Sequence, residues 1–383
     1  MDKKQRVESA IKGKQVDIIP WTMYFGVPPQ SRAELDFRTS GLSIVYASPV
    51  CKNLVNNVEV KEEISYIFRK NDGTQIFDRT FITPYGEIFC KYQFKINNEI
   101  PEPGQYFAIN KSSLDISVLS WVKEYPFKKE SDYKLLKYFY ENTNFVPLND
   151  DYNRTVKIVG SEGITMLNVG FSPFQALLFQ LMGVERTVFE YYDNNKKFIS
   201  LYELLYEKYR EKYLLAAESP ALAIWAPENI TASIVSPKLF KEFHLPFYKE
   251  MAEILHRKGK IYIAHFDGLV LPLAKLIAKS DLDVIEAFTP FPMGDMTISE
   301  ARDAWKDKVI WMNFPGTIIS KNDEIDTREF TLDLLKSIAP GDRFLIGCTE
   351  IFPMDNWPGI FNQVCRILNQ YGKYPIKPNN IPD

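Results

Sequence analysis

The stretch "KIYIAHFDGLVLPLAKLIAKSDLDVIEAFTP" at residues 260–290 decides the fold, because it reads as a strand, a helix and a second strand. The runs "KIYIA" and "LDVIEAF" are short and apolar, as is typical of strands that are buried on both faces. The segment between them, "LVLPLAKLIAKS", carries apolar residues at helical spacing. Two strands joined by a crossover helix form a parallel unit, so this stretch predicts a parallel sheet.

The alternation of strands and helices continues on both sides of this stretch. Short apolar runs predict further strands in "DIIPWTMYFG" (17–26), "TVKIVGSEG" (155–163), "ALAIWAPEN" (221–229), "KVIWMNFPG" (308–316) and "RFLIGCTE" (343–350). Helical patterns separate most of these strands from residue 132 onward. About eight such units over the whole chain favour a closed barrel over an open sheet. We therefore predict an α/β fold, a (β/α)8 TIM barrel with an N-terminal helix.

The segment at residues 63–94 has a different pattern. Apolar and polar residues alternate on either side of Asp72-Gly73, and a second turn is indicated from Pro84 to Gly86. This pattern predicts a β-hairpin inserted into the N-terminal part of the chain. Since no low-complexity tract interrupts the sequence, we expect residues 1–383 to form a single domain that carries this hairpin.

Composition narrows the class of function. The formal net charge is -3, with both signs interspersed, which argues against a nucleic-acid groove or a basic membrane face. No apolar run reaches the length of a membrane span, and the charged N-terminus does not resemble a signal peptide. The four cysteines are far apart and form no CxxC motif. We expect a cytoplasmic protein that acts on a small molecule.

Polar residues gather where the predicted strands end. In a barrel of this class, catalytic groups stand at the C-terminal ends of the strands and in the loops that follow. The polar residues at these positions are Glu162, Glu228, Asn229, His265, Asp267, Glu286, Asn313, Cys348 and Glu350. We predict His265, Glu228 and Asn229 as catalytic residues. Glu286, with an aromatic wall of Trp21, Tyr24 and Phe25, is predicted to bind the substrate.

His265 and Asp267 suggest a metal site, because side chains two residues apart on an extended chain point to the same side. Zinc acts as a Lewis acid when three protein ligands leave one position open. His265, Asp267, Cys348 and Glu350 are the predicted ligands. Alternatively, Asp267 only orients the imidazole, or His265 is a structural residue. The dinucleotide, P-loop and serine hydrolase motifs GxGxxG, GxxxxGK[ST] and GxSxG are absent.

Several segments resemble one family. "HFDG" at 265–268, "LDVIEAFTPFPMGDMTISEARDAWKDKVIW" at 282–311 and "FLIGCTEIFPMDN" at 344–356 are similar to the uroporphyrinogen decarboxylase superfamily. "TPYGE" at 83–87 and "SPKLFKEFHLPFYKEMAEILHRKGK" at 236–260 share this resemblance. It covers most of the chain, and it implies a (β/α)8 barrel with a deep cleft.

The superfamily holds two kinds of enzyme. True uroporphyrinogen decarboxylases carry an N-terminal motif whose paired arginines hold the substrate carboxylates. The corresponding stretch of this sequence, "IIPWTMYFGVPPQS" at 18–31, contains no arginine. The corrinoid-dependent methyltransferases have a zinc site of pattern HxC with a later cysteine. His265 and Cys348 match that pattern, but Asp267 replaces the middle thiolate. A carboxylate makes the metal harder, which would suit an oxygen-bound methyl group.

The resemblance therefore implies an enzyme, a zinc-dependent methyltransferase that moves a methyl group from a methoxylated aromatic compound to the Co(I) of a separate corrinoid protein. Its expected cofactors are zinc and a corrinoid that the partner protein carries. Its expected partners are that corrinoid protein and a small methyl donor, without nucleic acid or membrane, and a homodimer stays open. The alternatives are transfer from a methylcorrinoid to coenzyme M or tetrahydrofolate, a uroporphyrinogen-type decarboxylase, and a binding protein without catalysis.

Overall fold

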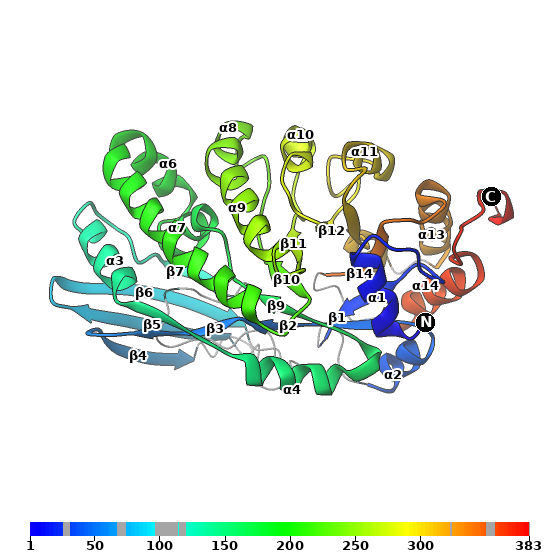
Figure 1. The fold of residues 1–383 in the computed structure, drawn as a ribbon, viewed down its shortest axis with the longest axis horizontal. Coiled ribbons are helices and arrows are strands. Elements are labelled where there is room, and N and C mark those ends of the chain that lie inside the picture. The colour runs from blue at the N-terminus through cyan, green and yellow to red at the C-terminus, as the bar shows by residue number, and fades with distance from the viewer. Residues whose placement is uncertain are drawn as a thin grey trace.

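A closed barrel of eight parallel strands forms the centre of the computed structural model (Figure 1). The order of strands around the barrel is β1-β14-β13-β12-β11-β10-β9-β2. The structure describes residues 1–25, 31–66, 74–95, 114, 120–321, 324–349 and 357–382. The barrel strands are β1 (Trp21–Tyr24), β2 (Ser43–Pro49), β9 (Gly163–Asn168), β10 (Ala223–Ala226), β11 (Ile261–His265), β12 (Val284–Phe288), β13 (Val309–Asn313) and β14 (Phe344–Cys348).

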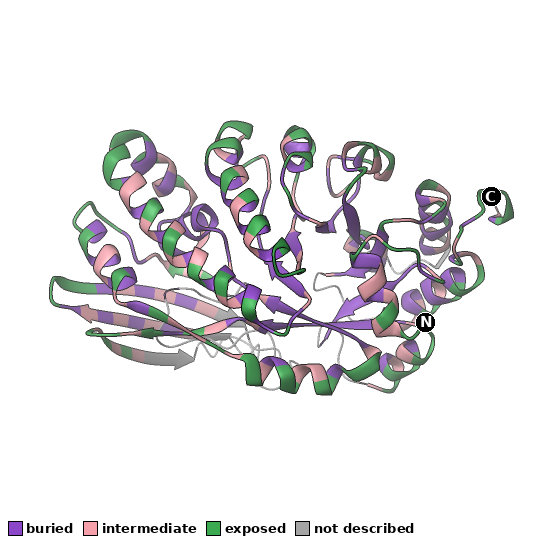
Figure 2. Cartoon of the chain, in the orientation of Figure 1, coloured by how far each residue is buried: buried purple, intermediate pink, exposed green. Residues whose placement is uncertain are grey.

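Helices surround the barrel and expose their outer faces, whereas the barrel strands are almost wholly buried (Figure 2). The α-helices are α1 (Lys3–Ile11), α2 (Arg32–Thr39), α3 (Asp132–Glu141), α4 (Asn149–Val159), α5 (Pro173–Ala176), α6 (Val184–Asp193), α7 (Asn195–Glu218), α8 (Pro237–Leu239), α9 (Leu245–His256), α10 (Ala274–Ala278), α11 (Ile298–Ala304), α12 (Gly316–Lys321), α13 (Glu324–Ile338) and α14 (Trp357–Tyr371). Shorter helical turns are η1 (Gly160–Glu162), η2 (Leu177–Leu181), η3 (Phe240–His244), η4 (Leu271–Leu273) and η5 (Pro378–Asn380). The predicted (β/α)8 barrel is confirmed.

Two antiparallel sheets interrupt the barrel between β2 and β9. One pairs β3 (Cys51–Val55) with β8 (Thr143–Pro147). The other contains β4 (Glu59–Tyr66), β5 (Thr74–Thr83), β6 (Gly86–Lys95) and β7 (Ser120–Glu124) in that order. The predicted hairpin at 63–94 thus falls on β4, β5 and β6, and its first turn at Asp72-Gly73 lies outside the described residues.

One predicted strand is wrong. Residues 155–159 of "TVKIVGSEG" belong to helix α4, and the barrel strand β9 begins only at Gly163. In α4 the buried residues Tyr152 and Val159 lie seven positions apart on one face, which is helical spacing, while Ile158 is exposed. Glu162 therefore lies at the start of a barrel strand and not at its end, where its carboxylate accepts a hydrogen bond from Lys3.

The strands divide the core into an inner and an outer layer. Successive side chains of a strand point to opposite faces, so alternate residues fill the barrel and the others meet the helices. The inner layer contains Val45, Ile164, Trp225, Ile263, Val284, Val309, Trp311 and Leu345. The buried residues of α1, Val7, Ala10 and Ile11, belong to this same cluster. Helix α1 therefore closes the N-terminal end of the barrel.

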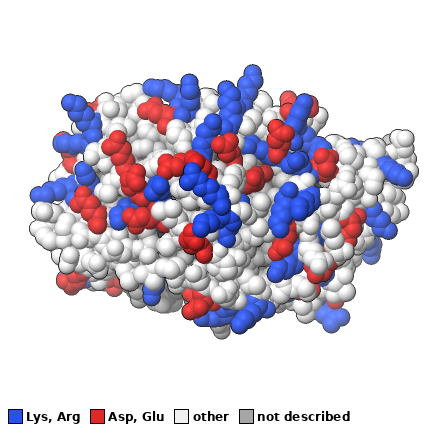
Figure 3. Space-filling view, viewed as in Figure 1, with Lys and Arg blue, Asp and Glu red and all other residues white. Residues whose placement is uncertain are grey.

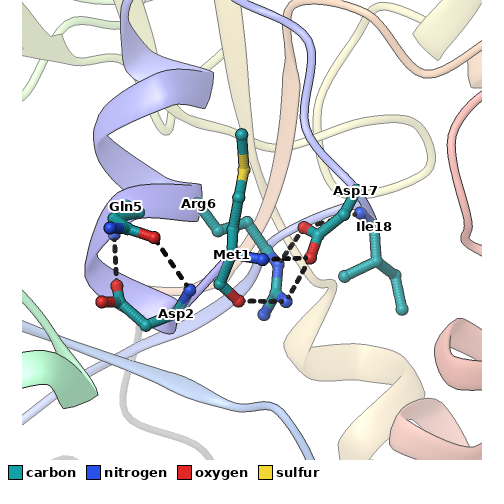
Figure 4. A network of polar contacts seen from close by, with 6 residues as sticks. All are labelled: Met1, Asp2, Gln5, Arg6, Asp17 and Ile18. Atoms are coloured by element: carbon teal, nitrogen blue, oxygen red, sulfur yellow. Dashed lines mark hydrogen bonds and ion pairs between the residues drawn. The ribbon is translucent and has the colours of Figure 1, made fainter.

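Polar contacts fix α1 in this position (Figure 4). Asp2 caps the helix by accepting from the backbone N–H of Gln5, whose side chain accepts from the N–H of Asp2. The guanidinium of Arg6 donates to Asp17, and the N-terminal ammonium pairs with the same carboxylate. Hydrogen bonding to Arg6 holds the pKa of Asp17 well below its usual value. The carboxylate therefore links the helix to the segment that leads into β1.

The surface shows no gathering of one sign of charge on the face in Figure 3, where basic and acidic side chains are interspersed. Among the helices in the described ranges, none has both the length and the apolar character that a membrane span requires.

Ile11→Ala tests whether α1 closes the barrel. Ile11 is buried against the inner layer, so its truncation should lower the free energy of unfolding by about 2–4 kcal/mol. Ile158→Ala is the matched control, because Ile158 is 58% exposed on α4 and its loss should cost about 0.5 kcal/mol or less. Urea denaturation of both variants measures the difference. Equal stability of the two variants would contradict the closing role of α1.

Candidate active site

His265 lies at the C-terminal end of β11 and points into the barrel. Along this strand Ile263 belongs to the inner layer, while Tyr262 and Ala264 belong to the outer core. Alternation therefore places His265 on the inner face, as the sequence pattern predicts. Directly across the pair of strands, His265 is in register with Glu286 of β12. The two side chains consequently meet at the mouth of the barrel.

Glu286 is completely buried and receives three hydrogen-bond donors. His265 Nδ1 lies 2.7 Å from its Oε2, and the indole N–H of Trp225 donates to the same oxygen over 2.9 Å. The hydroxyl of Tyr24 donates to Oε1 over 2.8 Å. A buried carboxylate needs such partners, because its burial without them costs several kcal/mol. Glu286 thus orients the imidazole ring of His265.

A β-bulge follows Glu286. The pairing of β12 with β13 shifts between Glu286 and Phe288, and Ala287 between them has a φ of 59°, in the left-handed region. A bulge places two residues of one strand opposite one residue of its neighbour, which re-aims the side chains on either side. The bulge is the local feature that ends the regular strand at the level of Glu286.

Asp267 stands on the other side of the imidazole. Its Oδ2 lies 3.4 Å from His265 Nε2, and its Oδ1 is buried with no hydrogen-bond partner among the described residues. The predicted convergence of His265 and Asp267 is therefore found. His265 has a carboxylate at each ring nitrogen, and this arrangement is called the His265 clamp below.

Charge in the clamp favours the imidazolium form. Burial opposes the positive charge of His265, but the charges of Glu286 and Asp267 prevail and raise the pKa of His265 well above its usual value. Burial likewise opposes ionisation of Asp267, yet the imidazolium holds the pKa of that carboxyl below its usual range. The clamp is thus an ion triad with a proton held on the histidine.

Gly268, the last residue of the HFDG motif, lies where the chain passes very close to the loop after β10. A Cβ built on Gly268 would lie 2.4 Å from the Cβ of Thr231 and 2.6 Å from the backbone oxygen of Ile230. Any other residue would push these loops apart. The glycine therefore allows the loop after β11 to pack beside the loop after β10.

Glu228 belongs to a second buried cluster at the end of β10. Its carboxylate accepts from the backbone N–H of Ser172 over 2.8 Å and from the Ser172 hydroxyl over 3.0 Å. His244 Nδ1 lies 3.3 Å from the same hydroxyl. Burial raises the pKa of Glu228 to about 8 and lowers the pKa of His244 to about 3. Burial therefore favours the uncharged forms of both Glu228 and His244.

Other predicted site residues lie elsewhere. Trp21 and Phe25 were expected to wall a pocket, but Trp21 packs in the outer core against Phe314 and Phe361. Phe25 packs beside Tyr46 of β2. Both side chains pack in the core. Trp21 occupies an outward position of β1, and Phe25 is the outward residue that follows this strand. Tyr24 alone points inward, and it contacts Glu286. Asn229 is exposed on the loop after Glu228.

The structure brings two predicted zinc ligands, His265 and Asp267, together and places a third, Cys348, away from them. Leu345 of β14 is an inner residue, and alternation puts Cys348 on the outer face, where it joins the outer core. Glu350 lies outside the described residues. The carboxylate of Glu286, a predicted substrate-binding residue, meets three protein donors. Within the described ranges, no group of three His, Cys, Asp or Glu side chains is arranged to hold a metal ion.

The sequence interpretation missed Trp225, Ser172 and the role of Tyr24. Trp225 lies two positions after the inner residue Ala223 of β10, so strict alternation could have placed its indole in the barrel. Ser172 gave no signal, because it follows β9, whose position was predicted wrongly.

Glu228→Gln tests the buried protonated carboxyl. The unfolded chain releases this proton above about pH 4.5, whereas the folded protein holds it up to about pH 8. Its contribution to stability is therefore complete below about pH 4.5 and is lost as the pH rises toward 8. The amide variant avoids this loss. Between pH 5 and 8, its free energy of unfolding should therefore rise relative to that of the wild type by on the order of 2–4 kcal/mol.

Denaturation midpoints of both proteins across this pH range provide the measurement. Glu242→Gln is the control, because Glu242 is an exposed glutamate. If the difference between the Glu228 variant and the wild type does not change with pH, Glu228 is ionised in the folded protein.

Comparisons with known proteins agree with this architecture. Residues 122–311 match the family described as Uroporphyrinogen decarboxylase (URO-D), which covers just under half of the chain. Among solved structures, a methyltransferase from Methanosarcina mazei superposes with a TM-score of 0.59 at 11% sequence identity. The match covers 97% of this chain and 99% of that chain. No curated protein matches the sequence. The family match and the shared fold support the resemblance to the uroporphyrinogen decarboxylase superfamily.

Proposed function

We propose that the protein is a corrinoid-dependent methyltransferase, the component of an O-demethylase that takes a methyl group from a methoxylated aromatic compound. The His265 clamp carries this proposal, because it sets a proton donor at the mouth of a barrel of this superfamily. The structural likeness to a methyltransferase adds support at the level of the fold.

The reaction needs a group that stabilises the leaving oxygen. When the methyl carbon is attacked, its bond to oxygen breaks and the electron pair stays on the oxygen. His265 Nε2 donates its proton to this oxygen, so that a neutral phenol leaves. Glu286 fixes the ring by holding Nδ1, and Asp267 stabilises the imidazolium before transfer. A corrinoid carried by a partner protein would supply the Co(I) nucleophile for the methyl group.

The charge of the site argues against the decarboxylase alternative. Asp267 and Glu286 add two carboxylates at the mouth, and His265 offsets only one of them. A substrate with several carboxylates would meet repulsion here, whereas a methoxylated aromatic compound would not. Transfer from a methylcorrinoid to coenzyme M or tetrahydrofolate would use the same barrel, and a requirement for either compound in the assay would identify that reaction.

Zinc at this site is an alternative to proton donation, because a nitrogen of His265 that binds zinc cannot also carry the transferable proton. His265 and Asp267 provide two donors, and the unpartnered Oδ1 of Asp267 is available, but the described residues do not complete a set of three. A third ligand would come from outside the described residues, where Glu350 lies, because Cys348 belongs to the outer core. A bound zinc would polarise the same leaving oxygen as a Lewis acid.

His265→Gln tests the proposal. Formation of methylcobalamin from cob(I)alamin and a panel of methoxyaromatics should fall by about 10²–10⁴-fold, because the proton donor is lost while the contact with Glu286 can be kept. Elemental analysis of both proteins tests the zinc proposal, since zinc bound through His265 should be lost in the variant. His256→Gln, on the outer helix α9, is the control. A His265 variant with wild-type activity would contradict the assignment.

Glu286→Gln tests the positioning role of this carboxylate. Without its charge, the pKa of His265 should fall, and the activity should be lost at lower pH than in the wild type. Because the imidazolium is present below its pKa, the alkaline limb of the pH–rate profile should move toward neutral pH. The acid limb serves as the internal control. A lower rate with an unchanged profile would indicate a structural role only.

A further inference from the structure

A cavity lies at the N-terminal end of the barrel and is called the β1 cavity below. Its volume is about 490 Å³, a size that is usual for sites that bind small molecules. It is formed by α1, the segment that leads into β1, the end of α2 and the end of α14, with lining residues that include Arg6, Asp17, Trp21, Ser40, Leu368 and Lys373. Because β1 and β2 begin beside it, the β1 cavity and His265 are at opposite ends of the barrel.

The floor of the β1 cavity is apolar. Ile19, Trp21, Cys365 and Leu368 line it, and all four side chains are buried. Contact with such side chains removes the apolar surface of a ligand from water, which is favourable. The floor therefore favours a ligand with an apolar body.

Trp21 adds one polar group to this floor. Its indole N–H is buried and has no acceptor in the part of the chain that the structure describes. An indole nitrogen can only donate, and a buried donor without an acceptor lowers stability. The indoles of Trp225 and Trp311, in contrast, donate to Glu286 and Thr22. An oxygen atom of a ligand in the β1 cavity would supply the acceptor that Trp21 lacks.

The rim of the β1 cavity carries an excess of positive charge. Arg6, Asp17 and Lys373 are the charged residues among its described lining residues. The Arg6 guanidinium donates to both carboxylate oxygens of Asp17, so these two charges offset each other (Figure 4). Lys373 is exposed and forms no ion pair with the described residues. One positive charge is therefore left for a ligand.

We propose that the β1 cavity binds a small carboxylate with an apolar body, at a site separate from the candidate active site. The body would lie on the floor, and the carboxylate would accept the hydrogen bond of the Trp21 indole. The charge of Lys373 favours an anion over a neutral compound of the same shape. An amine would meet repulsion from Lys373, and its ammonium would offer the indole no acceptor. Binding here does not depend on the reaction proposed for the mouth of the barrel.

The test observes the indole N–H of Trp21 by NMR in a protein with ¹⁵N-labelled tryptophan. The probe is cyclohexanecarboxylate, which has no aromatic ring to shift nearby signals by itself. We expect a saturable downfield shift of the Trp21 indole proton, because a new hydrogen bond deshields it. The signals of Trp225 and Trp311 should stay in place, and Trp225 also reports any binding at the mouth. Trp21→Phe assigns the signal.

Affinities measured by calorimetry test the charge of the ligand. Cyclohexanecarboxamide, which keeps the shape and an oxygen acceptor, should bind at least tenfold more weakly than the carboxylate. Lys373→Glu should weaken binding of the carboxylate by about three- to tenfold. Lys377→Glu is the matched control, because Lys377 is also exposed but does not line the β1 cavity. Both are surface substitutions, so this comparison holds even if Trp21→Phe does not fold.

Four outcomes would overturn the proposal. At about 10 mM probe, a ligand of this size binds even with modest efficiency, so an unchanged Trp21 signal would show that the site does not exist. A shift of Trp225 alone would place the ligand at the mouth. Equal affinity for the carboxylate and the carboxamide would show that the cavity does not select an anion. Equal affinity of the Lys373 and Lys377 variants would contradict the role of the rim charge.

Discussion

The ion pair between His265 and Glu286 is the interaction on which the candidate site depends. Glu286 has no exposure to water, so its charge is tolerable only because three donors from β1, β10 and β11 converge on it. Removing one partner of a buried pair of this kind typically costs about 3–5 kcal/mol. The same contacts that stabilise the carboxylate therefore fix the histidine at the mouth.

The two ends of the barrel have different tasks. At the N-terminal end, α1 packs apolar side chains into the inner layer, and the contacts of Arg6 with Asp17 hold it there (Figure 4). At the C-terminal end, polar groups replace apolar ones, and the pKa values of His265 and Glu228 are shifted. Shifted pKa values in a barrel mouth are typical of catalytic sites, because catalytic acids and bases need pKa values that are matched to their task.

The barrel could be predicted from sequence because most of its strands are short apolar runs between amphipathic helices. Strand β2 was missed because the two antiparallel sheets follow it in the chain, so the alternation of strand and helix stops there. "TVKIV" at 155–159 alternates apolar and polar residues over too few positions to separate a strand from a helix. His265 and Asp267 were predictable, since alternation relates positions within one strand.

Contacts between strands could not be read in this way. The outward direction of Cys348 depends on which alternate set of β14 faces the barrel, and apolar residues fill both sets. Likewise, the pairing of Glu286 with His265 depends on the register of β11 and β12, which the closed barrel determines. Sequence patterns thus located the ends of most barrel strands, but not those of β2 and β9. Register and side-chain direction decided which polar groups meet.

The clamp itself can be observed most directly by NMR of histidine side chains. The chain has only three histidines, so His244, His256 and His265 can be assigned from single substitutions in a protein with ¹⁵N-labelled imidazoles. The account predicts that both ring nitrogens of His265 carry protons at pH 7.5, where His244 is uncharged. A neutral ring at His265, or one with a metal-bound nitrogen, would contradict the clamp as the source of the proton.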